Sequence, residues 1–119
     1  VVSIARAISY AASTMAKDLD LNTIVTMTQS GGTARMVSSY RPSANIYAMT
    51  TMIETYRALS IIWGVIPILV DKYNSSDEIP ELAKNKLQDM DVILSDEKFI
   101  ITGGVPVNIP GTTNYISVL

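Results

Sequence analysis

Apolar and polar residues alternate along this chain with two periods, one typical of helices and one typical of strands. In residues 2–17 apolar side chains recur every three or four positions, with Arg6 and Lys17 elsewhere on the helical wheel. This spacing predicts four helices: residues 2–17, 33–40, 52–62 and a segment that ends at 90 after a cap-like cluster at 75–78. Short runs rich in β-branched residues predict five strands: residues 23–27, 45–49, 65–70, 98–102 and 113–119.

The order of these elements predicts the fold. Helices and strands alternate up to residue 102, which favours right-handed crossovers and parallel strands. Residues 103–111 form a predicted loop without a helix, so the strand after it should run antiparallel at one edge. Pro67 cannot donate a hydrogen bond to a neighbouring strand, so we expect it at the start of its strand or on an edge. We therefore predict one α/β domain over residues 1–119, a three-layer α/β/α sandwich. Its five-stranded mixed sheet should have the first four strands parallel and the last edge strand antiparallel.

Composition excludes several classes of chemistry. The chain has no cysteine and no histidine, which removes disulfides, thiolate metal sites, cysteine nucleophiles and the commonest general base. Its formal net charge is −2 and it has no basic stripe, which argues against nucleic-acid binding. The longest apolar run, residues 61–70, is too short to span a membrane. The carboxylates resemble helix caps and solvated surface residues, so we expect no catalytic residue and no metal ligand. The chain begins at Val1 without a visible signal peptide, and we expect a fragment of an intracellular protein.

The most informative segment is residues 26–35, Thr-Met-Thr-Gln-Ser-Gly-Gly-Thr-Ala-Arg, which joins a predicted strand to a predicted helix. The N-terminus of a helix presents unpaired N–H groups and roughly half a positive charge. Glycine has no side chain that would keep an anion away from the backbone. The loop therefore suits a phosphate group. Alternatively, Ser30 and Thr33 simply cap the helix that follows.

Several spaced motifs resemble the C-terminal domain of pyruvate kinase, along nearly the whole chain. They are TQSGGTAR at 28–35, VSSYRP at 37–42, ALS at 58–60, WGVIP at 63–67, TGGVPV at 102–107 and PGTTN at 110–114. In that family the domain is a five-stranded α/β/α sheet with one antiparallel edge strand. This agrees with the elements predicted from the residues alone.

The resemblance implies a parent enzyme of glycolysis that transfers a phosphoryl group from phosphoenolpyruvate to ADP in the cytoplasm, with Mg²⁺ and usually K⁺. It also implies that the substrate and metal ligands belong to a preceding barrel domain, so no catalytic residue carries over. The C-terminal domain of the family binds a phosphorylated effector, a sugar phosphate or a nucleotide. Carried over by position, the phosphate ligands would be Thr28, Ser30, Gly31, Gly32 and Thr33. The loop 104–111 would be a lid, with Gly104, Val105, Pro106 and Gly111 as its marker residues.

Two departures from the family pattern bear on the effector. Members that bind fructose 1,6-bisphosphate carry a tryptophan and an arginine where residues 71–97 of this chain have neither. Gly32 stands where other members often have a basic side chain. Fewer cations would neutralise a doubly phosphorylated ligand poorly. We therefore expect a monophosphate such as a pentose phosphate or AMP, or no effector at all. The alternative function is a free-standing phosphate-binding protein of the same fold.

The resemblance also implies assembly, because C-terminal domains of the family pair with each other in tetramers. Residues 2–17 and 113–119 are the candidate dimer face, since an uncovered edge strand invites pairing. Trp63 is expected in the core or in an interface. Arg41 is expected to anchor its loop, for instance to a carboxylate.

Overall fold

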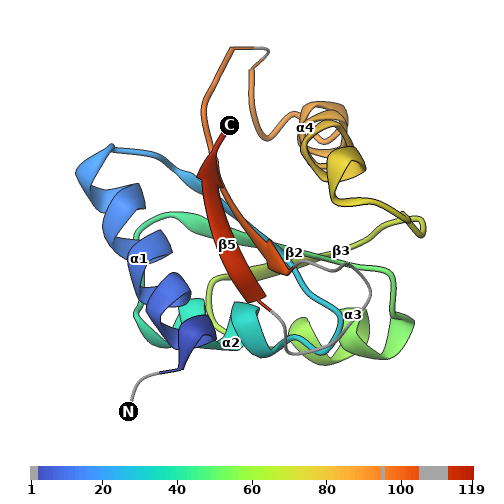
Figure 1. Ribbon diagram of the computed structural model, residues 1–119, viewed down its shortest axis with the longest axis horizontal. Helices are drawn as coiled ribbons and strands as arrows, with labels where there is room; N and C mark the ends of the chain where they lie inside the picture. Colours follow the sequence, from blue (N-terminus) through green and yellow to red (C-terminus); the bar gives the residue numbers. More distant parts are fainter. Residues whose placement is uncertain (1–2, 95, 105–112) are drawn as a thin grey trace.

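The computed structural model describes residues 3–94, 96–104 and 113–119 (Figure 1). Its helices are α1 (Ile4–Asp18), α2 (Gly32–Ser39), α3 (Ile53–Leu59) and α4 (Ile79–Asp89), with a short 3-10 helix η1 (Ser76–Glu78) directly before α4. Its strands are β1 (Thr23–Met27), β2 (Asn45–Thr50), β3 (Val65–Leu69), β4 (Ile100–Gly104) and β5 (Thr113–Val118). Each helix and strand predicted from the sequence is present, with small differences at the ends.

The strands form one sheet in the order β3-β2-β1-β4-β5. The pairs β3–β2, β2–β1 and β1–β4 are parallel, and β5 runs antiparallel to β4. This confirms the predicted α/β fold with four parallel strands and a last antiparallel edge strand. Pro67 lies opposite Ala48 in the middle of β3, which is an edge strand. The edge position expected for this proline is therefore confirmed.

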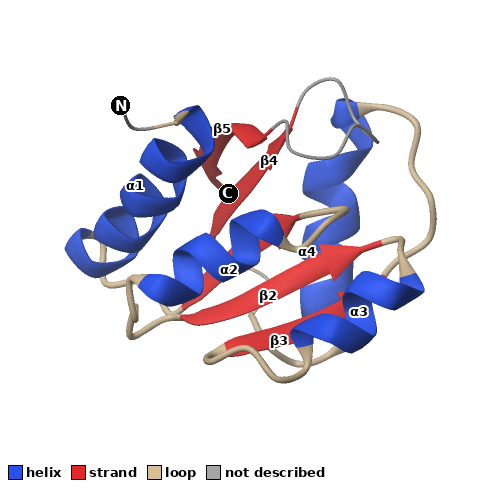
Figure 2. Ribbon diagram, turned by 90° about the horizontal axis from the view of Figure 1, so that it is seen from below, coloured by secondary structure: helices blue, strands red, loops and turns tan. Residues whose placement is uncertain are grey.

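Helices cover both faces of the sheet, as Figure 2 shows. α1, α2 and α3 lie on one face, where Ala12, Ala16 and Leu59 join a buried cluster with Ile24 and Ile100. Small alanine side chains on α1 leave room for the helix to pack against the sheet. α4 covers the other face (Figure 2).

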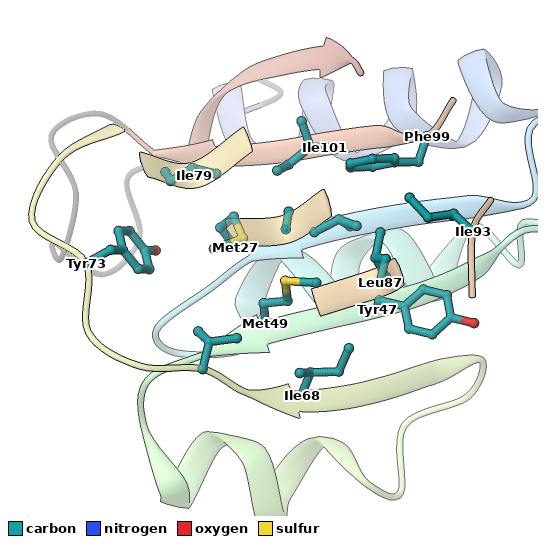
Figure 3. Close-up of a cluster of buried hydrophobic side chains, with 13 residues drawn as sticks. Met27, Tyr47, Met49, Ile68, Tyr73, Ile79, Leu87, Ile93, Phe99 and Ile101 are labelled. Atoms are coloured by element: carbon teal, nitrogen blue, oxygen red, sulfur yellow. The ribbon is translucent and has the colours of Figure 1, made fainter. Parts of the chain in front are cut away.

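The core beneath α4 is the larger of the two apolar clusters. Ile79 and Leu87 of α4 pack in one cluster with Met49 and Ile101 of the sheet and with Phe99, which directly precedes β4 (Figure 3). Phe99, Leu87 and Met49 have no exposed surface. Burying side chains of this size stabilises the fold by roughly 1.5–3 kcal/mol each. The fully buried strands explain why the sequence shows continuous apolar runs here, without the alternation of a half-exposed sheet.

Two helix boundaries follow local chemistry that the sequence displays. Ser75 and Glu78 form a capping box, with the Glu78 carboxylate accepting from the Ser75 N–H at 2.9 Å, as the cap-like cluster predicted. α3 ends at Leu59, earlier than the predicted residue 62. Residues between Leu59 and β3 turn back on themselves, with Ile62 N–H bonding to the Leu59 carbonyl at 3.1 Å and Gly64 at a φ of 69°.

The predicted loop at residues 103–111 was wrong at its first two positions, because Gly103 and Gly104 extend β4. Gly103 lies opposite Tyr115 of β5. A Cβ on Gly103 would stand 2.5 Å from the Tyr115 hydroxyl oxygen, so only glycine leaves room for the ring at this position. Gly103 therefore makes the strand possible at a position where glycine's usual preference indicates a turn.

Candidate functional site

The loop between β1 and α2 lies at the topological switch point of the sheet. From β1 the chain moves to β2 and then β3 on one side, whereas β4 lies on the other side of β1. Connections from β1 and β4 therefore lead away from each other at the carboxyl ends of these strands. In open α/β sheets, ligands bind in the crevice that forms at this place.

Internal hydrogen bonds hold the loop in one shape. The Thr28 hydroxyl accepts from the Gly31 N–H at 2.8 Å, and the Ser30 hydroxyl accepts from the Gly32 N–H at 3.3 Å. The Thr28 N–H donates to the Met49 carbonyl at 3.0 Å, which ties the loop to β2. These bonds bring Thr28, Ser30, Gly31 and Gly32 into one compact turn that leads into α2.

Ser30 and Thr33, the residues offered as caps of the helix, do not occupy its N-cap position. The N-cap of α2 is Gly31, in a left-handed conformation with φ 87°, and no side chain caps the helix from that position. Ser30 bonds to the first helical N–H from the preceding position. The Thr33 hydroxyl meets the hydroxyl of Thr113.

Two backbone donors at the start of α2 have no acceptor among the described residues. The first four N–H groups of any helix lack an intrahelical partner. Here Thr28 and Ser30 satisfy Gly31 and Gly32, and no described residue accepts from the N–H of Thr33 or Ala34. Both donors belong to the positive end of the helix dipole, where an anion is stabilised.

Gly31 and Gly32 have different physical requirements. Gly31 combines its positive φ with a tight surrounding, because a Cβ there would stand 3.1 Å from Cδ2 of Leu59. Among the described residues, a Cβ on Gly32 would meet the Ser30 hydroxyl oxygen at 3.5 Å, which is ordinary contact. Gly31 is therefore needed for the fold of the loop, whereas Gly32 leaves space above the start of α2.

Gln29 connects the loop to the start of α3, a connection that the sequence did not reveal. Its side-chain oxygen accepts from the Thr51 hydroxyl at 2.9 Å, and its backbone carbonyl accepts from the Thr55 hydroxyl at 2.6 Å. Thr51 and Thr55 are four positions apart at the start of a helix, so both can face the same neighbour. This spacing was the only feature of the sequence that indicated the contact with Gln29.

Of the predicted lid, the structure describes only one end. Gly104 is the last residue of β4. Val105, Pro106 and Gly111 lie outside the described residues. β5 begins at Thr113, whose contact with Thr33 brings the end of this connection to the first turn of α2.

Two buried hydroxyls below the loop were also missed by sequence reasoning. Thr26 of β1 and Thr102 of β4 are partners in the parallel register, and both have no exposed surface. Neither hydroxyl oxygen has a hydrogen-bond partner within the described ranges. Burying an unpaired hydroxyl is costly, so the two residues mark the switch point as a polar spot inside an apolar layer.

Trp63 and Arg41 contact each other. The guanidinium carbon of Arg41 lies 4.6 Å from the centre of the Trp63 ring, a cation–π arrangement. Trp63 is 49% exposed, so the expectation that it lies in the core is wrong. Its exposure leaves the second expectation, a position in an interface, as a prediction. We expected Arg41 to anchor its loop by contact with a carboxylate, and its guanidinium instead lies over the ring of Trp63.

The titratable groups with a shifted pKa lie in and beside the core under α4. Burial raises the pKa of Tyr73. Burial, together with the charge of Tyr73, raises the pKa of Tyr115 to about 12. Within the parts of the chain that the structure describes, no group of three acidic side chains could hold a metal ion. We therefore derive no step through Mg²⁺ or K⁺ from these residues. No helix in the described ranges is long and apolar enough to cross a membrane.

Together, the sheet order and the loop define an open α/β domain with a glycine- and hydroxyl-rich turn at its switch point. The family model of the pyruvate kinase alpha/beta domain matches residues 6–119. The chain belongs to the pyruvate kinase family, as this α/β domain.

Relatives of known name agree with this assignment. Pyruvate kinase of Clostridium acetobutylicum is 40% identical over 111 residues, which is 93% of this chain and 24% of that protein. Pyruvate kinase of Bacillus licheniformis is 40% identical over 117 residues, 98% of this chain and 20% of the relative. The structure of Cryptosporidium parvum pyruvate kinase in complex with ADP matches with a TM-score of 0.88 and 31% identity, over 100% of this chain and 24% of that one. The chain therefore spans about a quarter or less of the length of these relatives.

Proposed function

We propose that this chain is the regulatory and assembly domain of a pyruvate kinase, which transfers phosphoryl from phosphoenolpyruvate to ADP in glycolysis. The observation that carries this proposal is the 40% identity to a pyruvate kinase over 93% of the chain. The reacting groups, with Mg²⁺ and K⁺, would belong to a barrel domain of the same protein, which works in the cytoplasm. The alternative, a free-standing phosphate-binding protein, requires that the reading frame has no barrel domain upstream.

The effector site of this proposal is the turn before α2. The hydroxyls of Thr28 and Ser30 each accept one backbone hydrogen bond, which leaves their own protons to donate to a phosphate oxygen. The N–H groups of Thr33 and its successor Ala34 add two donors at the positive end of the helix. Gly32 adds no side chain of its own at this position.

The ligand of this site is a monophosphate, a pentose phosphate or a nucleoside monophosphate. The turn itself contributes hydroxyls and backbone donors, and its nearest cation in sequence is Arg35, an exposed residue of α2. Neutral donors and a helix dipole suit one phosphate group better than two, because a second group adds charge without a matching cation.

The test is a charge placed in the turn. The Cβ of a glutamate at position 32 would make ordinary contact with the Ser30 hydroxyl oxygen, and a carboxylate is favourable in the first turn of a helix. The carboxylate of Gly32→Glu would repel a phosphate on the same N–H groups. We expect it to weaken binding of ribose 5-phosphate and AMP about tenfold or more, measured by calorimetry on the intact protein. Asn85→Glu adds the same charge on the exposed face of α4, in the other helix layer, and should leave both affinities unchanged. Equal affinities in Gly32→Glu and the unchanged protein would place the phosphate elsewhere.

The partners we propose are a second copy of this domain and the barrel domain. α1 exposes Ile4 at 68% and Tyr10 at 59%, and β5 is an edge strand next to it. Exposed apolar side chains beside an open strand edge favour pairing between copies. A sedimentation profile of monomers only, at high micromolar concentration, would contradict this assembly.

The second exposed apolar surface lies where α3 leads into β3. Ile61 is 87% exposed, and Trp63 and Ile66 are 49% and 39% exposed. We assign this surface to the barrel domain. Ile61→Asp should therefore loosen the contact between the two domains and raise hydrogen exchange along β3 in the intact protein. Unchanged hydrogen exchange along β3 in Ile61→Asp would contradict the assignment of this surface to the contact with the barrel domain.

A further inference from the structure

Two helices join the turn before α2 to the exposed apolar surface of Ile61, Trp63 and Ile66. α2 begins at the turn, and residues at its other end contact Trp63. The Ser38 hydroxyl donates to the Trp63 carbonyl at 2.5 Å, and the Arg41 guanidinium lies over the Trp63 ring. α3 lies on the same face of the sheet (Figure 2) and leads into this surface at its C-terminal end. The turn and the Trp63 surface are therefore connected by two routes.

α3 is attached to the turn through Gln29. Thr55 of α3 donates its hydroxyl proton to the Gln29 carbonyl at 2.6 Å, and Thr51, which precedes the helix, donates to the Gln29 side chain at 2.9 Å. Gln29 stands between Thr28 and Ser30, whose hydroxyls are the proposed phosphate ligands. A phosphate that displaces these two hydroxyls therefore also displaces the residue to which α3 is bonded.

The side of α3 also packs closely against the turn. A Cβ on Gly31 would stand 3.1 Å from Cδ2 of Leu59 and 3.4 Å from Cγ2 of Thr55. Leu59 has no exposed surface. Close-packed interiors transmit displacements because they contain little empty space to absorb them. α3 has seven residues and is therefore about 10 Å long, so a shift of the turn reaches the far end of the helix through one rigid element.

The far end of α3 leads directly into the surface that we assign to the barrel domain. Backbone hydrogen bonds continue from the helix to β3, because the Ile62 N–H donates to the Leu59 carbonyl at 3.1 Å and the Val65 N–H donates to the Ile62 carbonyl at 3.2 Å. Ile61, at 87% exposure, and Trp63 lie within this hydrogen-bonded segment. Movement of α3 therefore moves the side chains that face the barrel domain.

We propose that α3 couples the phosphate site to the contact with the barrel domain, and that Thr55 is the positioning residue through which the coupling passes. Thr55 lies within the helix and contacts the turn both at the Gln29 carbonyl and beside Gly31. This inference rests on the proposed effector site and adds its regulation. Coupling of this kind is reciprocal, so the contact with the barrel domain changes the affinity for phosphate by the same factor as phosphate changes that contact.

Hydrogen exchange on the intact protein, with and without ribose 5-phosphate, tests where the effect of binding travels. We expect the ligand to change exchange along α3 and in residues 60–65, and to leave α4, on the other face of the sheet, unchanged (Figure 2). Thr55→Val keeps the shape of the side chain and removes the hydroxyl that donates to Gln29. In this variant ribose 5-phosphate should still bind, and its effect on residues 60–65 should disappear. Thr55→Ser keeps the hydroxyl and should retain the effect.

A mutant cycle with Ile61→Asp measures the coupling by calorimetry. This variant loosens the contact with the barrel domain, so with Thr55 present it should change the affinity for ribose 5-phosphate by about fivefold or more. In the Thr55→Val background, Ile61→Asp should leave that affinity unchanged within about twofold. Asn85→Asp is the matched control, because it adds the same charge on the exposed face of α4 and should leave the affinity unchanged in both backgrounds.

The outcomes separate the two proposals. Binding that is lost in Gly32→Glu but leaves exchange along α3 unchanged would overturn the coupling and keep the phosphate site. An equal effect of the ligand on residues 60–65 in Thr55→Val, or an equal effect of Ile61→Asp in both backgrounds, would overturn the role of Thr55. Absence of ribose 5-phosphate binding, or binding that Gly32→Glu leaves intact, would overturn the effector site and the coupling with it.

Discussion

The hydroxyls of Thr33 and Thr113 contact each other although the two residues are 80 positions apart in sequence. Thr33 lies in the first turn of α2 and Thr113 is the first residue of β5. Both side chains are buried, at 6% and 9% exposure. The contact therefore ties the turn before α2 to the antiparallel edge strand, on the far side of β4.

This pair should behave as one unit in stability measurements. Thr33→Val leaves the Thr113 hydroxyl buried without its partner, and we expect a loss of about 1–3 kcal/mol in the free energy of unfolding. Adding Thr113→Val removes the orphaned group, so the double variant should recover part of the loss. Urea denaturation of the two single variants and the double variant measures the coupling. Strictly additive losses would mean that the hydroxyls do not depend on each other.

The adjacent glycines of the turn should respond in opposite directions to alanine. Gly31→Ala forces a side chain into a left-handed backbone and against Leu59, and we expect it to destabilise the fold by about 1–3 kcal/mol. Gly32→Ala fits an open helical position, and we expect it to stabilise by about 0.5–1 kcal/mol. Chemical denaturation measures both. A similar loss in both variants would contradict the different roles assigned to the two positions.

The end of α4 offers a stabilising substitution. Asp91 has a φ of 58°, and the next residue, Val92, donates its N–H to the Leu87 carbonyl at 2.9 Å, closing the helix. Glycine adopts this left-handed conformation more readily, so Asp91→Gly should raise the melting temperature, corresponding to about 0.5–1 kcal/mol. Lys84→Gly, on the exposed face in the middle of α4, is the control and should destabilise by about 1 kcal/mol. A loss of stability in Asp91→Gly would mean that the aspartate side chain contributes more than its backbone costs.

Alkaline pH should destabilise the protein through Tyr115. Its pKa is raised to about 12 in the folded state, from 10.0 in the unfolded chain, first by burial and then by the charge of Tyr73. Between these values the unfolded state has released a proton that the folded state retains, so the free energy of unfolding falls as pH rises from 10 towards 12. Below pH 10 the contribution is fully present. Tyr115→Phe should flatten this part of the stability profile, measured by denaturation at a series of pH values, and an unchanged slope would assign it to other groups.

Short-range patterns predicted much of the fold correctly. Ser75 with Glu78 marked the start of η1, the short helix directly before α4, and Pro67 indicated that β3 is an edge strand. Both effects act within a few residues of the chain. The end of β4 was not predicted. Gly103 belongs to a strand only because the Tyr115 ring lies across it, and that partner stands 12 positions further along the chain.

The candidate site divides in the same way. The hydroxyls and glycines of residues 28–33 were visible in the sequence, since one turn contains them all. The contacts of Gln29 with Thr51 and Thr55 were not visible, nor was the contact of Arg41 with Trp63. Each of these joins segments that follow different strands, and their approach depends on the order of the strands in the sheet.

The sequence by itself determined the class of fold, the positions of the helices and strands, the absence of cysteine and histidine chemistry, and the turn before α2. These depend on periodicity, composition and local hydrogen bonding, which act along the chain. Only the tertiary structure decided that β1 lies between β2 and β4, that Thr33 meets Thr113, and that Thr55 contacts Gln29. These features arise when strands distant in sequence become neighbours. Burial of the apolar faces of the strands brings their loops together, and the sequence of one loop does not indicate which other loop it will contact.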